Sequence, residues 1–292
     1  MDWHSRKISS ILENALLEDK ATSDATTRAC IDPQQRATAT ILARQDCVLS
    51  GLGAVSAILA IYERLDANVI GHSEVVSHGE IFDGVRLHKG QTIAVVRHNA
   101  RVLLSCERVI LNVMQRLSGV ATLTRQFVDA VQGTKAHILD TRKTVPGLRV
   151  LDKYAVRCGG GQNHRLDLSD SVLIKNNHIS LAGGVGPALR NAIQNRRGEQ
   201  PIEIEVRTLG ELEEALNNGA EAVLLDNMNV EDVRRSMERV QTHSRRVPIE
   251  VSGGIRLENV RSYADTGADY ISVGALTHSA RAVDLSMRIF PA

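Results

Sequence analysis

Six short apolar segments, each ending in a polar residue or glycine, alternate with amphipathic stretches over residues 136–274. The segments are AHILDT (136–141), SVLIK (171–175), IEIEV (202–206), AVLLD (222–226), IEVSG (249–253) and YISVG (270–274). Stretches with helical spacing follow at 209–219, 230–240 and 257–267. Gly219 and Gly267 end two of them, as C-terminal helix caps do. Repeated strand–helix units predict a parallel sheet covered by helices, and this many units favour a barrel.

The residues before about 108 have a different hydrophobic pattern, in which glycine, histidine and aspartate interrupt short apolar runs. Glu74–Val96 is predicted to be rich in strands, with turns at Asp83-Gly84 and Lys89-Gly90. This part resembles half of a biotinyl or lipoyl carrier, but Lys89 lacks the methionine neighbours of a carrier lysine. We therefore favour a plain β element.

GLGAVS (51–56) is similar to a dinucleotide-binding loop but lacks the third glycine, and it predicts a turn from strand to helix.

The composition argues against several other classes of protein. The 292 residues carry a formal net charge of +1, which gives no reason to expect nucleic acid or a membrane as partner. An aromatic content of 3% argues against binding by base stacking. Four widely spaced cysteines without a CxxC pair, and no long apolar run, predict reduced thiols and a cytoplasmic protein.

Polar and charged residues recur where the predicted strands end. In a barrel the loops at the carboxyl ends of the strands form the active site, so these residues are candidates for function. In IEIEV, alternation places Glu203 and Glu205 on one face, with Glu205 nearer the mouth. Glu203 is as readily an ion-pair partner inside the barrel as a functional group. The full set is Asp140, Arg142 and Lys143; Lys175, Asn176, Asn177 and His178; Glu203 and Glu205; Asp226; Ser252 and Gly253; and Gly274.

Several of the candidates are basic. His164 and Arg165 follow the glycines 159–161, and Arg142, Lys143 and Lys175 lie at strand ends. Two like charges ~4 Å apart repel by about 4 kcal/mol at an effective dielectric constant of 20. A cluster of this kind therefore predicts a small ligand with more than one negative charge. Cys158 has no apparent base partner and is interpreted as packed.

The last two predicted strands lead into glycine turns that precede helices. SGGI (252–255) comes before the helix at 257, and VGALTHSA (273–280) contains Gly274 before another helical start. Helix N-termini after such turns present free N–H groups to phosphate, and this is the usual phosphate site of a barrel.

These motifs resemble the quinolinate phosphoribosyltransferase family. The likeness lies in ILDTRKTVPGLRVLDKYAVRCGGGQNHRLDLSDSVLIKNNHI (138–179), in ERVILNVMQRLSGVATLT (107–124), in EAVLLDNM (221–228) and in residues 249–280, with a weaker likeness at 15–27. It implies an enzyme of NAD biosynthesis that converts quinolinate and 5-phosphoribosyl 1-pyrophosphate to nicotinate mononucleotide, pyrophosphate and CO2. It implies a Mg²⁺-dependent homodimer. The implied fold is α/β, with an N-terminal sandwich (1–112, joined by the tail 278–292) and an incomplete barrel (113–277).

The resemblance also implies roles for individual residues. Arg142, Lys143, His164, Arg165 and Lys175 would line the quinolinate pocket beside Thr141, and Arg108 would reach in from the neighbouring subunit. Glu205 and Asp226 would handle the ribose hydroxyls and the metal, directly or through the substrate. Ser252, Gly253 and Gly254, with Val273, Gly274 and Ala275, would bind phosphate. Lys143, Lys175, Glu205 and Asp226 are the expected catalytic residues. Val145, Asn176 and Val251 depart from the usual family pattern.

Alternatives remain at this stage. A paralogue of the same fold, of the type associated with molybdenum transport, would act on another acid. A Schiff-base aldolase would use Lys175 as its nucleophile. A sensor of phosphorylated metabolites would need no acidic residues beside the sugar, whereas Glu205 and Asp226 are both present.

Overall fold

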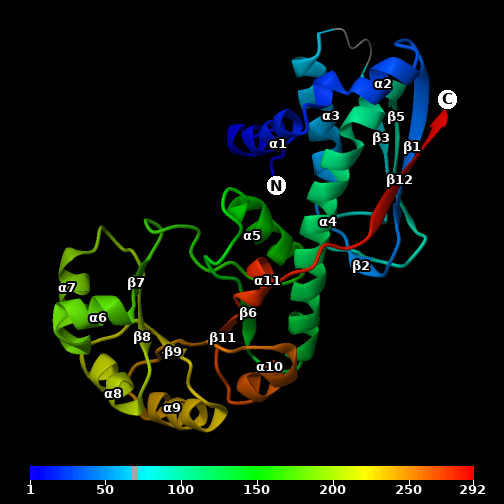
Figure 1. Cartoon of the computed structure of the whole chain (residues 1–292). Coiled ribbons are helices and arrows are strands. Elements are labelled where there is room, and N and C mark those ends of the chain that lie inside the picture. The colour runs from blue at the N-terminus through cyan, green and yellow to red at the C-terminus, as the bar shows by residue number, and fades with distance from the viewer. Residues whose placement is uncertain (68–71) are drawn as a thin grey trace. The chain divides into compact units, whose positions relative to one another are not determined.

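The computed structural model describes residues 1–67 and 72–292, which divide into two compact units (Figure 1). The first unit contains residues 1–123, 145–160 and 280–292, and the second contains 124–144 and 161–279. Helix α4 (Ala100–Ala130) begins in the first unit and ends in the second. The boundary expected at 112/113 stays a prediction. Among the described residues, no helix has the length and hydrophobicity that a membrane crossing requires.

An antiparallel sheet forms the framework of the first unit, in the order β12-β1-β5-β3. Its strands are β1 (Arg36–Ala43), β3 (Glu74–Val76), β5 (Thr92–Asn99) and β12 (Leu285–Pro291). Ala39 lies opposite both Val96 and Ile289, so the C-terminal strand pairs with the first one. Alternate residues of β1 are buried, as expected for a sheet with one face against the core.

Helices and a small strand pair complete the first unit. They are α1 (Arg6–Glu18), η1 (Ala21–Ser23), α2 (Ala25–Cys30), α3 (Gly53–Leu65) and α5 (Arg149–Cys158), with β2 (Cys47–Val48) paired to β4 (Arg86–Leu87). GLGAVS does lead from β2 into α3, and the strands predicted within Glu74–Val96 are present. The predicted turn glycines have positive φ, +100° at Gly84 and +91° at Gly90.

The long helix α4 was not predicted from the sequence. Its buried side chains include Leu103, Ile110, Met114 and Leu117, which recur at three- to four-residue multiples and so carry the helical signal.

The second unit is built on a parallel sheet of six strands, in the order β6-β11-β10-β9-β8-β7 (Figure 1). The strands are β6 (His137–Leu139), β7 (Val172–Ile174), β8 (Ile202–Val206), β9 (Ala222–Asp226), β10 (Ile249–Ser252) and β11 (Tyr270–Ser272). All six predicted strands are confirmed. β6 and β7 are the edges of the sheet, which is the incomplete barrel that was predicted.

The register of β8, β9 and β10 places their polar residues next to one another across the sheet. Leu224 lies opposite both Glu205 and Glu250, and Asp226 lies opposite Ser252. The acidic and polar side chains of β8, β9 and β10 therefore fall in adjacent rows. Ile204 and Val251, which alternate with them, are fully buried, so a layer of helices covers the other face.

The helices of the second unit are α6 (Asn176–Ala182), α7 (Val185–Asn195), α8 (Leu209–Asn217), α9 (Val230–Thr242), α10 (Leu257–Ala264) and α11 (Ala275–His278). Thr208 caps α8 by accepting the N–H of Glu211 at 3.1 Å, an interaction worth about 1 kcal/mol. Gly219 (φ +83°) and Gly267 (φ +86°) adopt the left-handed conformation of helix caps, as predicted.

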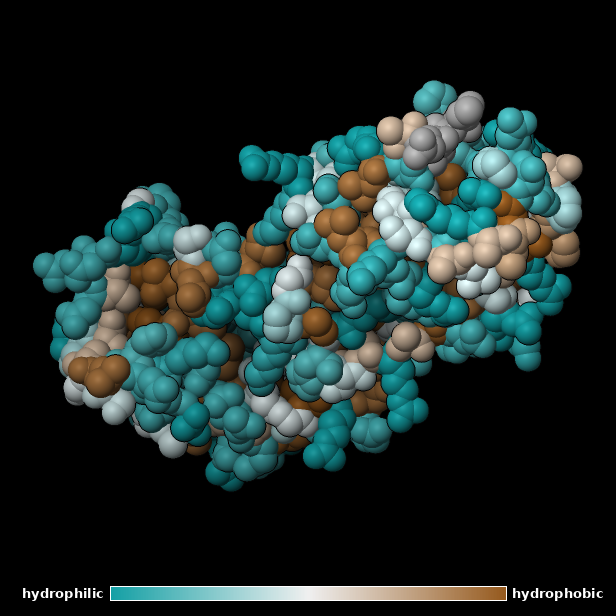
Figure 2. All heavy atoms as spheres, turned by 45° about the horizontal axis from the view of Figure 1, so that its top comes forward, coloured by the Kyte–Doolittle hydropathy of each residue, from teal (hydrophilic) through white to brown (hydrophobic). Residues whose placement is uncertain are grey.

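Hydrophilic residues cover most of the face shown in Figure 2, with hydrophobic residues exposed in places. The exposed large apolar side chains of the second unit include Leu168 and Leu181. Scattered apolar side chains are normal on a protein surface and carry no functional argument.

Candidate active site

The second unit contains a pocket of about 140 Å³ at the carboxyl ends of its strands. Leu173, Leu224, Glu250 and Ser272 line it together with most of the predicted site residues. Those are Thr141, Arg142, Lys143, His164, Arg165, Lys175, Glu205, Asp226 and Ser252. All five predicted basic groups therefore border one cavity, together with both predicted acidic groups.

Asp140 holds the basic segments in place. It directly follows β6 and is fully buried, and its carboxylate accepts the N–H of His164 at 2.9 Å and the amide of Asn163 at 2.5 Å. The carbonyl of Lys143 accepts the hydroxyl of Thr277 at 2.8 Å. Asp140, which the sequence made a candidate at a strand end, lies outside the pocket lining and anchors the loop that carries His164 and Arg165.

The guanidinium groups of Arg142 and Arg165 line the pocket, and each has a hydrogen-bond donor without an acceptor among the described residues. The Nε atoms of Arg142 and Arg165 are buried and have no hydrogen-bond partner within the described ranges. Arg165 Nη1 donates to the carbonyl of Ser171 at 3.0 Å, which fixes the side chain. Burial, and then the charge of Arg142, lower the pKa of Arg165. A buried donor without an acceptor costs about 1–3 kcal/mol, so this arrangement favours an anionic ligand.

The acidic pair lies at the ends of β8 and β9. Glu205 is buried, and its Oε1 accepts the side-chain amide of Asn176 at 2.9 Å. Arg207 Nε donates to Asp226 Oδ2 at 3.3 Å. Burial, and then the charge of Asp226, raise the pKa of Glu205, while Lys175 and Arg207 oppose the shift. Asn176, a departure from the family pattern, thus acts as a donor to Glu205.

One acidic residue of the pocket, Glu250, was not predicted from the sequence. The Nε2 of His164 lies 3.4 Å from Glu250 Oε2 and 3.3 Å from Glu203 Oε2. Burial, and then the charge of Glu203, raise the pKa of Glu250 to about 8. The signal was the alternation in β10, since Glu250 stands two residues before Ser252 and shares its face. Glu203 lies beside His164 inside the barrel, in the position that the ion-pair interpretation predicts, and a functional role for it stays a prediction.

The remaining predicted residues lie outside the pocket lining. Gly253 has φ +93°, and a side chain there would collide with Asn227, so glycine is required at the turn after β10. Gly274 precedes α11, where an added Cβ would lie 3.2 Å from the side chain of Lys143. Arg108 is an exposed residue of α4 in the first unit. The phosphate roles of Gly253, Gly254, Val273, Gly274 and Ala275 stay predictions.

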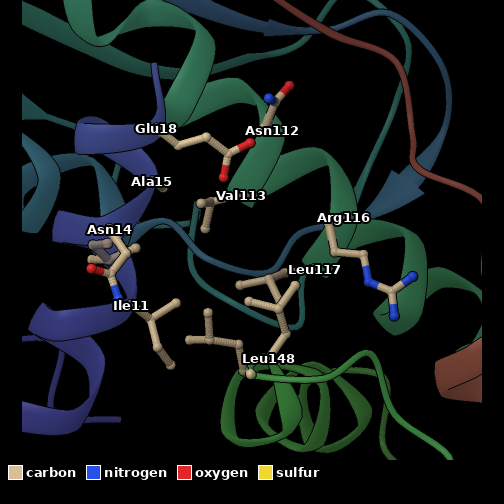
Figure 3. Close-up of a pocket in the computed structure, with 12 residues that line it drawn as sticks. Ile11, Asn14, Ala15, Glu18, Asn112, Val113, Arg116, Leu117 and Leu148 are labelled. Atoms are coloured by element: carbon tan, nitrogen blue, oxygen red, sulfur yellow. The ribbon is translucent and has the colours of Figure 1, made fainter. Parts of the chain in front are cut away.

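The first unit has a larger cavity, of about 380 Å³, which is mostly apolar. Figure 3 shows Ile11 of α1, Leu117 of α4 and Leu148 converging on it. Arg116, at its border, donates to both carboxylate oxygens of the fully buried Asp152 at 3.1 and 3.0 Å. This pair is already satisfied, so the cavity offers less for an anion than the pocket of the second unit.

A parallel sheet that ends in a pocket with clustered cations and paired carboxylates defines a barrel enzyme for a small anionic substrate. Residues 24–118 match the N-terminal domain of quinolinate phosphoribosyl transferase, and residues 120–288 match its C-terminal domain. The chain belongs to the quinolinate phosphoribosyltransferase family. It is accordingly a phosphoribosyltransferase of pyridine nucleotide biosynthesis, and this replaces the aldolase interpretation of Lys175.

Individual relatives are similar to this chain over nearly its whole length. A nicotinate-nucleotide pyrophosphorylase [carboxylating] of Mycobacterium leprae is 42% identical over 94% of this chain and 95% of its own length. A probable enzyme of that name from Bacillus subtilis is 39% identical over 97% and 93%. The crystal structure of NadC from Streptococcus pyogenes matches with a TM-score of 0.91 at 35% identity, covering 100% of this chain and 99% of that one.

Proposed function

We propose that this chain joins quinolinate to 5-phosphoribosyl 1-pyrophosphate and releases nicotinate mononucleotide, pyrophosphate and CO2. The observation that carries the proposal is the single pocket in which Arg142, Lys143, His164, Arg165 and Lys175 face Glu205 and Asp226. Quinolinate has two adjacent carboxylates, and the ribosyl donor brings a phosphate and a pyrophosphate. A site for both must offer many cations and a few carboxylates.

Arg142 and Arg165 bind the quinolinate carboxylates in this scheme. A guanidinium presents a planar fork of N–H donors that matches a carboxylate, and both side chains have an unused buried Nε. Lys143 and Lys175 add charge at the rim of the same pocket, where both are exposed. Held in this way, the pyridine nitrogen is oriented toward the anomeric carbon of the ribose.

Glu205 and Asp226 act at the sugar. As pyrophosphate leaves, positive charge develops on the ribose ring, and two nearby carboxylates stabilise it. They also accept hydrogen bonds from the ribose hydroxyls. Glu205 must be ionised for this role, and the charges of Lys175 and Arg207 favour that state against the effect of burial.

Mg²⁺ is the proposed cofactor, and Glu205 and Asp226 would hold it. The fit rests on their oxygen donors and on their mutual repulsion, which adds to burial in raising the pKa of Glu205 and which a cation would relieve. Two carboxylates are an incomplete ligand set, which suits an ion that keeps water and substrate phosphates as further ligands. When bound, the ion neutralises charge on the departing pyrophosphate.

Decarboxylation follows from the electronics of the alkylated ring. The cationic pyridinium accepts the electron pair that remains when the carboxylate next to the nitrogen leaves as CO2. The protein contributes position and exclusion of water, and no Schiff base is needed.

The test measures the relative amounts of the three products. Purified protein with quinolinate, 5-phosphoribosyl 1-pyrophosphate and Mg²⁺ is expected to form nicotinate mononucleotide, pyrophosphate and CO2 in equal amounts. Nicotinate in place of quinolinate should give no product, because one carboxylate leaves part of the cationic pocket unpaired. A protein that uses nicotinate equally well, or that releases no CO2, would contradict the proposal.

We also propose that the chain acts as a homodimer in the cytoplasm, with Arg108 reaching the active site of the neighbouring subunit. The exposed position of Arg108 on α4 is compatible with that role. Four free cysteines suit a reducing compartment. Sedimentation of the purified protein tests the dimer, and a monomer with full activity would refute the shared site.

A further inference from the structure

A second cavity lies inside the second unit, at the amino-terminal ends of the strands. It measures about 420 Å³, and Pro201, Ala222, Pro248 and Tyr270 border it where β8, β9, β10 and β11 begin. Its wall also contains His164 and Glu250, which line the active-site pocket as well. These two side chains therefore separate the active site from a rear cavity.

Glu250 is the buried polar group at this junction. Its side chain is 4% exposed, and its Oε1 has no hydrogen-bond partner in the part of the chain that the structure describes. Oε2 faces the Nε2 of His164 at 3.4 Å. A buried oxygen without a partner, on a residue that lines a substrate pocket, has room to act on a ligand.

The surroundings of Glu250 favour its neutral form. Glu203 approaches from β8, His164 from the segment after α5, Asp140 from just after β6, and Ser272 from β11. Burial raises the pKa of Glu250 to about 8, the charges of Glu203 and Asp140 add to this, and His164 and Ser272 oppose it. Asp226, at the end of the neighbouring β9, lines the same pocket. Near pH 7 the group is mostly a carboxylic acid, so it can donate a proton.

The reaction under "Proposed function", on which this inference rests, requires one proton. When the C–C bond to the leaving carboxylate breaks, its electron pair stays on the ring carbon. Until that carbon is protonated, it can recombine with CO2. We propose that Glu250 donates this proton from the floor of the pocket.

The O–H bond of Glu250 breaks and a C–H bond forms on the ring carbon, using the pair left by decarboxylation. Glu250 becomes a carboxylate and CO2 departs. Glu250 then takes up one proton from the solvent through the rear cavity, so this step consumes one proton from solution.

His164 is less suited to this donation. Its Nδ1 accepts the N–H of Arg165 at 2.7 Å, so the other ring nitrogen carries the hydrogen and points to Glu203 and Glu250. His164 is thus a positioning residue for Glu250. Arginine side chains are always protonated and are used here to hold carboxylates.

The test compares Glu250→Gln with the wild type in a single turnover with quinolinate, 5-phosphoribosyl 1-pyrophosphate and Mg²⁺. Glutamine keeps the shape but carries no acidic proton. We expect pyrophosphate release to stay within about threefold of wild type. Nicotinate mononucleotide should form at least about a hundredfold more slowly, the lower end of the range for loss of a general acid. Equal rates of product formation, or parallel loss of both products, would overturn the assignment.

The wild type gives a second measurement that does not depend on folding of the variant. Nicotinate mononucleotide formation should slow as pH rises through about 8, where Glu250 loses its proton, while pyrophosphate release does not. Parallel pH profiles would overturn the inference. Failure of the wild type to release pyrophosphate from these substrates would instead refute the proposed function, and the inference with it.

Discussion

Replacing Arg142 with alanine should lower the affinity for quinolinate without lowering the melting temperature of the protein. In the free protein, Arg142 and Arg165 are like charges in one pocket, each with a buried Nε that lacks a partner within the described residues. Removing Arg142 relieves this repulsion, so the melting temperature should stay the same or rise. Removing it also leaves a quinolinate carboxylate without its partner, so affinity should fall.

The size of the loss follows from burial. Truncating one member of a buried charge pair costs about 2–5 kcal/mol. Arg142 is half-buried, which places the expected loss in the lower part of that range, about 2–3 kcal/mol. Each 1.4 kcal/mol is a factor of ten, so quinolinate should bind roughly 30- to 150-fold more weakly. Binding of 5-phosphoribosyl 1-pyrophosphate should change little, because Glu205 and Asp226 are untouched.

Isothermal titration calorimetry with each substrate measures both effects. Arg234→Ala is the matched control, because it removes the same charge from an exposed position on α9. The control should bind both substrates as the wild type does. Wild-type quinolinate affinity in Arg142→Ala, or equal weakening for both substrates, would refute the pocket assignment.

Three further predictions concern other parts of the chain. If Arg108 completes the neighbouring site, mixing inactive Arg108→Ala with inactive Lys175→Ala should restore part of the activity, and no recovery after proven subunit exchange would contradict the shared site. Arg116→Ala leaves the fully buried Asp152 unpaired and should lower the free energy of unfolding by about 3–5 kcal/mol, as measured by urea denaturation; a change below about 1 kcal/mol would contradict it. Glu250 holds its proton more tightly folded than unfolded, so its contribution to stability falls between about pH 4.5 and about pH 8. The melting temperature of the wild type should therefore decline relative to Glu250→Gln over that range, and a constant difference would refute the raised pKa.

The second unit was largely predictable because its strands are apolar, short and bounded by polar residues. β8 and β9 have the predicted bounds, and alternation in IEIEV placed Glu203 and Glu205 on one inward face. Parallel strands bring their carboxyl ends to one edge, which is why side chains distant in sequence share a pocket.

Other features depend on partners that a linear pattern does not identify. Asp140 resembles a catalytic residue at a strand end, yet its carboxylate is used by the backbone of His164 and the amide of Asn163. Glu250 lies within a mostly hydrophobic strand, and its pKa depends on residues of the neighbouring strands β8 and β11 that the linear sequence does not identify. Asn176 was identified only as a strand-end residue that departs from the family pattern, whereas its amide donates to Glu205.

The most direct measurement is a crystal structure of the protein with quinolinate bound. The account predicts the pyridine ring in the second unit, with its two carboxylates on Arg142 and Arg165 and its nitrogen facing the side where Glu205 and Asp226 lie. Quinolinate bound elsewhere, or with those guanidinium groups turned to solvent, would contradict it.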